Sequence, residues 1–304
     1  MTKIDRKALA DAAIVLLREM FGEDFDFEYT EYFKSNEELT GIALRLPGCS
    51  NAPVVCLDDM PDDIPAKDVA NVAASIFQDA LRNFDKVMPV MPQMTREYVL
   101  ENVVLQALSR KRNRQMLKAH PHILFLDLAG IFRVPVGKWE KNSLSTALIT
   151  NQIAKKLDLT VDELAEAARQ NTINKFGIQL ISTQEMGQFF IQGHHQEPKP
   201  FQEVKMTAPG LYTLTNGIEV NGAALMLIPE ILETIGEKAG MDYYVLPSSI
   251  HELLIARDDG LVSAKQLKES VYMGNRTPEV VKPVHVLSDN VYHYSCKAKT
   301  LKIV

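Results

Sequence analysis

The chain has 304 residues, of which 46% are hydrophobic and 24% charged, a balance typical of a globular protein with one large domain or two smaller ones. Its formal net charge of −6 and pI of about 5.7 argue against a general nucleic-acid binder, which needs a basic face to displace counterions from phosphates. The three cysteines, Cys49, Cys56 and Cys296, have no framework spacing, so we expect reduced thiols in a cytosolic protein.

The first residues lead directly into an amphipathic pattern and contain no signal-peptide sequence. The most apolar stretch, residues 122–136, is interrupted by Asp127 and Arg133, and it is too short and too polar to cross a bilayer. We therefore expect a cytoplasmic protein that does not enter a membrane.

The N-terminal region has the pattern of a small α+β unit. Asp5 is positioned to cap a first amphipathic helix that ends at Gly22, and a second helix is expected over residues 65–84. Three strand-like segments lie between them, at residues 25–33, 39–46 and 53–57. The order helix, three-strand meander, helix predicts a compact unit with helices on one face of a sheet, and we assign it to residues 1–86.

Residues 87–94 are the best linker candidate, because Pro89 and Pro92 exclude a regular helix there. The methionines of this segment indicate that it packs against something. A larger α+β region is expected over residues 95–304.

Helical and strand patterns alternate in that larger region. Helices are expected over residues 95–118, 160–176, 229–239 and 264–273, the second of them opened by a capping box at Thr160 and Glu163. Strands are expected over residues 144–149, 211–215, 243–246 and 253–256, with a closing pair in 291–304, and residues 123–136 are expected to form one strand or two around Gly130. Asn216-Gly217 and Asn221-Gly222 have the composition of hairpin turns, and the apolar run 223–228 follows the second.

Residues 246–252, Leu-Pro-Ser-Ser-Ile-His-Glu, hold the densest set of chemically active side chains. Ser248 or Ser249 as nucleophile and His251 as base would make a hydrolase site, with Glu252, or Asp127 from elsewhere in the chain, as the orienting carboxylate. Neighbouring side chains of a strand stand parallel, however, and no Gly-x-Ser-x-Gly elbow is present. We favour a polar hairpin turn between strands 243–246 and 253–256 over a catalytic site or a capping box.

Three other groups of residues suggest chemistry. His194, His195 and Glu197 are weak candidates for metal ligands, because adjacent histidines diverge and the spacing matches no zinc motif. His122 could meet Asp127 around a bend, although His120-Pro121-His122 is more simply a helix terminus.

A basic run on the predicted long helix is the third group, and it comprises Arg110, Lys111, Arg112, Arg114 and Lys118. We interpret it as a solvated charge collar or a set of salt-bridge partners, and a local anionic ligand stays open. No phosphate loop, dinucleotide fingerprint, Cys-x-x-Cys or His-Glu-x-x-His is present, so we expect no cofactor.

Several segments in order resemble a known family. They are Pro53–Asp59, Arg112-Asn113, Pro121-His122, Phe125–Ala129, Asn221–Leu227, Leu246–Glu252 and Val286–Tyr292. Together they cover nearly the whole chain and resemble the bacterial domain-of-unknown-function family numbered 5688, known mainly from anaerobic Gram-positive bacteria. The resemblance implies a bacterial, cytosolic protein, and it transfers no activity and no catalytic residue.

We therefore expect an α+β protein that binds a ligand or partner without catalysis. The alternatives are the hydrolase described above and a scaffold or homo-oligomerisation protein that uses the Met-rich residues 87–94. The partner itself is unknown from the sequence.

Overall fold

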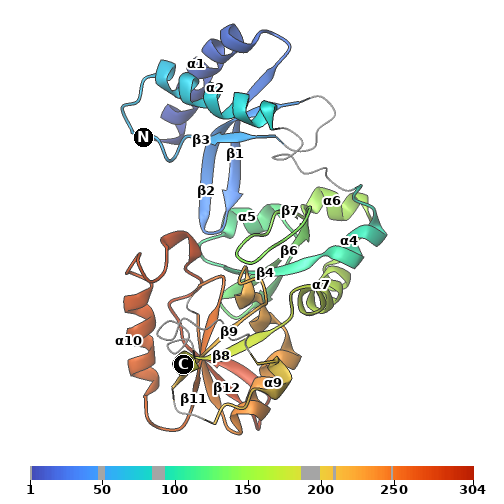
Figure 1. Cartoon of the computed structure of the whole chain (residues 1–304), viewed down its shortest axis with the longest axis vertical. Coiled ribbons are helices and arrows are strands. Elements are labelled where there is room, and N and C mark those ends of the chain that lie inside the picture. The colour runs from blue at the N-terminus through green and yellow to red at the C-terminus, as the bar shows by residue number, and fades with distance from the viewer. Residues whose placement is uncertain (1, 47–51, 84–92, 186–198, 208–209, 248) are drawn as a thin grey trace. The chain divides into compact units, whose positions relative to one another are not determined.

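The computed structural model describes residues 2–46, 52–83, 93–185, 199–207, 210–247 and 249–304. By its internal contacts the chain divides into two compact units, residues 1–92 (the N-terminal unit) and residues 93–304 (the C-terminal unit) (Figure 1). Helices and antiparallel sheets make up both units, so the expected α+β class is confirmed.

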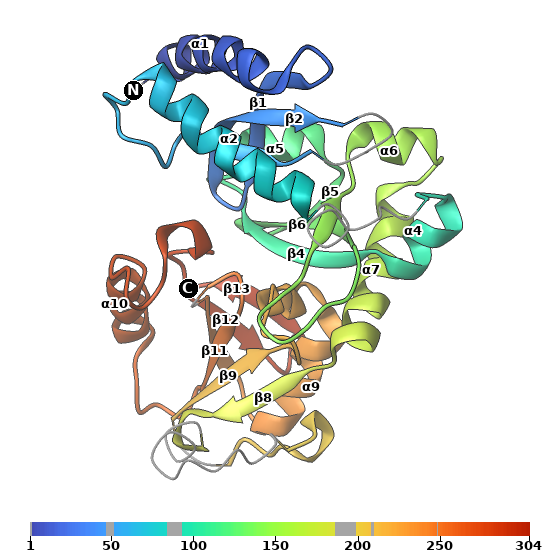
Figure 2. The same cartoon turned by 45° about the horizontal axis from the view of Figure 1, so that its top comes forward.

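The N-terminal unit follows the predicted order of elements. Its elements are α1 (Lys3–Phe21), β1 (Asp26–Lys34), β2 (Glu37–Arg45), β3 (Val54–Cys56) and α2 (Ala66–Arg82). The strands form an antiparallel meander in the order β1-β2-β3. Both helices lie on the same side of this sheet (Figure 2), and their apolar stripes meet it in one core that includes Leu17, Phe27, Ile42 and Phe77.

The cap of the first helix differs from the expectation. Thr2 is the N-cap residue, its hydroxyl accepting a hydrogen bond from the Asp5 amide, while the Asp5 carboxylate accepts one from the Thr2 amide. Asp5 therefore closes a capping box from the third helical position, because its carboxylate can reach back one turn.

The C-terminal unit contains two sheets and the helices around them. Its helices are α4 (Arg96–Asn102), α5 (Arg114–Ala119), α6 (Asn151–Lys156), α7 (Val161–Phe176), α9 (Pro229–Ala239) and α10 (Ala264–Gly274), with short 3₁₀ helices η1 (Phe201–Glu203), η2 (Gly222–Leu227) and η3 (Pro283–His285). Its strands are β4 (Val104–Ser109), β5 (His122–Phe125), β6 (Leu128–Pro135), β7 (Thr146–Leu148), β8 (Gln179–Ser182), β9 (Leu211–Thr215), β10 (Tyr243–Leu246), β11 (Leu253–Arg257), β12 (Tyr292–Ser295) and β13 (Thr300–Ile303).

The larger sheet has six strands in the order β13-β12-β10-β11-β9-β8, and the smaller sheet has β4, β6 and β5 in a row with β7 paired to β6. Every strand pairing in the described residues is antiparallel. One face of the six-stranded sheet packs on the main core, and α10 covers the other through Leu267 and Val271.

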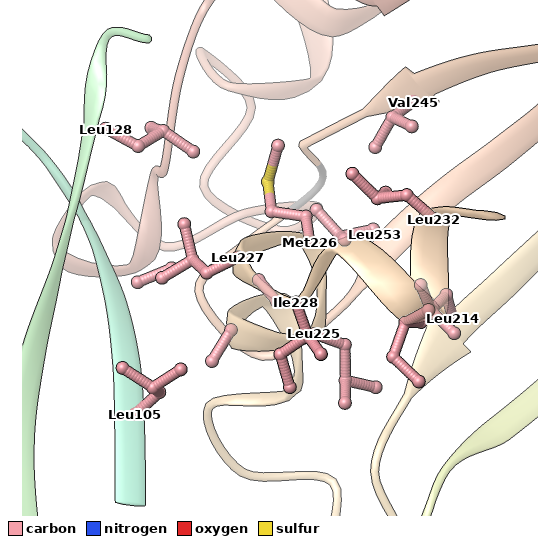
Figure 3. Close-up of a cluster of buried hydrophobic side chains, with 14 of the residues drawn as sticks. Leu105, Leu128, Leu214, Leu225, Met226, Leu227, Ile228, Leu232, Val245 and Leu253 are labelled. Carbon is pink, nitrogen blue, oxygen red and sulfur yellow. The ribbon is translucent and has the colours of Figure 1, made fainter. Parts of the chain in front are cut away.

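The main core lies between the two sheets and is centred on η2. Figure 3 shows Leu225–Ile228 between Leu105 and Leu128 of the smaller sheet and Leu214, Val245 and Leu253 of the larger one. Burying a side chain of this size stabilises a fold by about 1.5–3 kcal/mol, so this short segment holds the two sheets together.

The helix predicted over residues 95–118 is wrong. The structure has α4, then strand β4 over Val104–Ser109, then a turn and the short helix α5. All six residues of β4 are buried, so its sequence shows no alternation between apolar and polar side chains. Because its polar residues, Gln106 and Ser109, do not alternate with the apolar ones, the period of this segment does not distinguish helix from strand, and sheet pairing with β6 decides it.

The apolar run 223–228 is also not a hairpin strand, because it forms η2 instead. Two further elements, α6 and β8, were not predicted. By contrast, the hairpin around residues 247–252 is confirmed, since β10 and β11 pair antiparallel on either side of it. The Thr160 capping box is also confirmed.

Gly222 at the start of η2 offers a test of this packing. A Cβ there would lie 2.3 Å from Thr215 Oγ1 and 2.4 Å from the His251 carbonyl oxygen. We expect Gly222→Ala to lower the free energy of unfolding by about 1–3 kcal/mol, because the neighbours are backbone and a short hydrogen-bonded side chain. Denaturant titration measures this. Gly274→Ala, whose Cβ would meet only Val280 at 3.8 Å, is the control and should leave stability nearly unchanged.

Candidate functional site

The side chain of Asp127 joins the two sheets of the C-terminal unit through hydrogen bonds. Its Oδ2 accepts from Ser288 Oγ at 2.6 Å and from Asn290 Nδ2 at 3.0 Å, and its Oδ1 accepts from Tyr292 OH at 2.7 Å. A part-buried carboxylate needs such donors to replace lost water, and bonds to a charged group are stronger than neutral ones. The three contacts fix the β5–β6 turn against the segment that enters β12.

The donors come from alternate residues of one segment, 288–292, and the side chains of all three reach Asp127. Burial and the nearby Asp127 charge raise the pKa of Tyr292 far above its usual range. Its hydroxyl therefore stays protonated and remains a donor throughout the physiological range.

The turn at residues 246–252 is held by a separate set of bonds. Ser249 Oγ accepts from the His251 amide at 3.0 Å, the Ile250 amide donates to the His285 carbonyl, and Thr215 Oγ1 donates to the His251 carbonyl at 2.8 Å. The Asn221 amide donates to His251 Nδ1 at 3.3 Å. The turn is thus connected to η2 and to η3 by its backbone and its imidazole.

His251 and His285 form a pair of rings with centroids 4.5 Å apart, at 87° to each other. Burial and, second, the neighbouring His285 lower the pKa of His251 to about 4. Burial also lowers the pKa of His285. Both rings are therefore neutral near pH 7, and His251 acts as an acceptor for a backbone amide.

The candidate hydrolase residues are arranged as follows. Ser249 is buried and its hydroxyl bonds to backbone, His251 Nδ1 bonds to backbone, and Asp127 bonds to the 288–292 segment. Ser248 lies outside the described residues. The hydrolase hypothesis remains a prediction, with no serine–imidazole bond among the described residues to support it.

Two other predictions also concern residues outside the described ranges. His194, His195 and Glu197 lie outside the described residues, as do residues 87–92 of the Met-rich segment. Within the described ranges, no group of three or more His, Cys, Asp or Glu side chains is placed to hold a metal ion.

The segments around residues 110–127 form an open groove of about 760 Å³ on the C-terminal unit. It is lined by Arg110, Lys111, Arg114, Leu117, Lys118, His122, Leu124, Leu126, Asp127 and Ile303. His122 and Asp127 thus line one groove, although His122 Nδ1 bonds to the His120 carbonyl and Asp127 bonds elsewhere. We call it the basic groove.

Positive charge dominates the basic groove. Arg114 and Lys118 are one turn apart on α5 and share a face, while Arg110 and Lys111 precede that helix. Among the described residues, Asp127 is the only one with a side-chain carboxylate that lines the groove, and its oxygens already have three donors. Arg112, the fifth member of the basic run, instead donates to the Pro283 carbonyl.

Apolar side chains complete the groove and are unusually open to water. Leu124 is 56% exposed, and Leu126 and Ile303 are each 41% exposed. Leu126 also has a positive φ of 55° in the two-residue turn between β5 and β6. Asn or Gly would adopt this conformation with less strain, by about 1–2 kcal/mol, so an exposed leucine there points to a use for its side chain.

Sequence reasoning found the basic run and Asp127 but missed their partners. The alternating Ser288, Asn290 and Tyr292 were a detectable signal, because three polar groups at every second position face one way. Nothing in the sequence brings Ile303 or His285 to their places, because both contacts depend on how distant segments pack.

These features define a two-unit α+β protein whose C-terminal unit carries a basic, partly apolar groove. A family model described as "Family of unknown function (DUF5688)" matches residues 11–296, and the chain belongs to that family. Comparisons with curated proteins and with solved structures found no match. No helix in the described ranges is long and apolar enough to cross a membrane.

The Asp127 contacts predict that removing the negative charge of this side chain lowers the stability of the protein. Asp127→Asn keeps the size of the side chain but replaces an acceptor by a donor that faces other donors. We expect it to lower the free energy of unfolding by about 1.5–3 kcal/mol, the range for hydrogen bonds to charged groups. Denaturant titration measures the change. Glu269→Gln on the exposed surface of α10 makes the same charge change and should have little effect.

His251 predicts a dependence of stability on pH. Its folded pKa is about 4 and its ordinary value 6.5, so the unfolded chain binds more protons between them. The contribution of His251 is therefore full above pH 6.5 and is lost as pH falls toward 4. Unfolding titrations across this window should show a steeper loss for the native chain than for His251→Gln. Equal slopes would contradict the burial of a neutral imidazole.

Proposed function

We propose that the C-terminal unit is a non-catalytic binding module that holds an anionic partner with apolar groups in the basic groove. Its bacterial and cytosolic setting, implied by the family resemblance, is part of this proposal. The observation that carries it is the set Arg110, Lys111, Arg114 and Lys118 beside exposed Leu124, Leu126 and Ile303.

The cations of the groove support an anion because no carboxylate of the described residues pairs with Arg110, Lys111 or Arg114, and Lys118 bonds to the neutral Gln115. Like charges held on one short segment repel one another, and a bound anion would relieve this repulsion. The exposed leucines would gain by losing water against an apolar part of the same partner.

The Asp127 contacts support binding over chemistry. The carboxylate of Asp127 is occupied by hydrogen bonds that hold the fold, and the hydroxyl of the nearby Ser288 donates to it. The groove therefore offers charges and apolar contacts at fixed positions. The side chains of Asp127 and Ser288, which could take part in chemistry, instead hold the fold around the groove.

Binding of 8-anilinonaphthalene-1-sulfonate, which combines a sulfonate with aromatic rings, tests the proposal. We expect the double variant Arg114→Glu and Lys118→Glu to weaken binding at least tenfold in a fluorescence titration, with a strong dependence on salt. The matched control is Lys265→Glu with Lys268→Glu, which reverses two exposed charges on α10. Equal affinities of the two double variants would contradict a binding role for the groove.

Leu126 gives a second test, in which stability and binding move in opposite directions. Leu126→Asn relieves the positive-φ strain, so we expect the free energy of unfolding to rise by about 0.5–1 kcal/mol. Binding of the same dye should weaken severalfold, because an apolar wall of the groove is lost. A variant that is less stable and binds as before would show that Leu126 serves only the fold.

A further inference from the structure

The basic groove lies beside the edge of the six-stranded sheet. β13 is the terminal strand in the sheet order, and Ile303 of this strand lines the groove. Ile303 stands opposite Tyr292 in the register, so the two side chains share a face of the sheet. Because Tyr292 reaches Asp127 on that face, the β5–β6 turn and β13 border the same groove.

The backbone of β13 presents hydrogen-bonding groups at this edge. The Val304 amide donates to the Val291 carbonyl, so the backbone groups of Val304 point toward the β12 side. Orientation alternates along an antiparallel strand, which turns Lys302 toward β12 and turns Leu301 and Ile303 outward. The outer edge thus offers both donors and acceptors at every second residue.

An exposed edge strand can form hydrogen bonds with a strand of another chain. Lysine side chains on such edges commonly disfavour non-specific pairing and aggregation. Here the exposed Lys302 and the groove cations leave positive charge around the edge. They disfavour a basic strand and favour an acidic one. Exposed Leu124, Leu126 and Ile303 add contacts for aliphatic side chains.

We propose that the partner of the basic groove is an acidic polypeptide segment that adds to β13 as a further strand. This inference rests on the proposed function and names its partner class. An extended segment that carries both carboxylates and aliphatic side chains could contact the cations and the exposed apolar side chains that line the groove, while its backbone pairs with β13. A phosphate or another small anion would use donors alone and leave the outward carbonyls of β13 unpaired.

The test uses the full chain and a blocked seven-residue peptide of alternating Glu and Val. We expect saturating peptide to slow amide hydrogen exchange of Leu301 and Ile303 at least tenfold, while Lys302, already paired with β12, changes little. A Lys and Val peptide of the same length is the charge control. Two Glu and Val peptides, N-methylated on odd or on even residues, test the backbone pairing. Only one of them should lose affinity, by tenfold or more, because one edge of the added strand faces β13.

The outcomes separate this inference from the proposed function. Peptide binding that depends on Arg114 and Lys118 but leaves Leu301 and Ile303 unprotected, with both methylated peptides equally tight, overturns strand addition and keeps an anion-binding groove. Dye binding without peptide binding overturns the polypeptide as partner. Protection of Leu301 and Ile303 that rises with protein concentration alone would make a second copy of the chain the occupant and overturn a separate partner.

Discussion

The C-terminal unit depends on how the carboxylate of Asp127 is satisfied. This side chain sits where the β5–β6 turn meets the segment entering β12, and three donors from residues 288–292 converge on it. A charge taken partly out of water is costly unless its bonds are replaced, so the turn and the strand hold their relative positions. The exposed apolar side chains of the basic groove lie next to this contact, because Leu124 and Leu126 precede Asp127 and Ile303 pairs with Tyr292.

A second polar connection lies on the same segment. His285 meets His251 of the 246–252 turn, and the turn in turn bonds to Asn221 and Thr215 around η2. Residues 285–292 therefore connect the turn that the sequence analysis singled out to Asp127, without a bond between the two in the described residues. Of the segments that resemble the family, Asn221–Leu227 supplies the apolar centre of the core, and residues 246–252 and 286–292 supply polar contacts that connect its parts.

The residues of the basic groove differ from these polar contacts in backbone strain and in solvent exposure. Leu126 adopts a positive φ with an exposed side chain, where a fold alone would favour Asn or Gly. The cations of α5 and the preceding turn lack carboxylate partners in the described ranges, although the whole chain is acidic. The positive φ of Leu126 and the unpaired cations lower the stability of the fold, and no structural contact compensates for them in the described residues. This pattern is typical of residues that serve binding.

The sequence by itself determined the α+β class, the helix–meander–helix order of the N-terminal unit, the Thr160 cap and the hairpin around residues 247–252, because each depends on local periodicity or turn chemistry. It failed over residues 103–109, where a strand buried on both faces has no period to read, and over 223–228, where an apolar run became η2. The basic run could be identified in the sequence, but the groove that it lines could not. Tertiary packing made the basic run part of a groove by bringing Ile303 and the β5–β6 turn beside α5 and by pairing Asp127 with residues 288–292. Such contacts join positions more than 150 residues apart, as Ser288 and Asp127 do, and no local pattern encodes them.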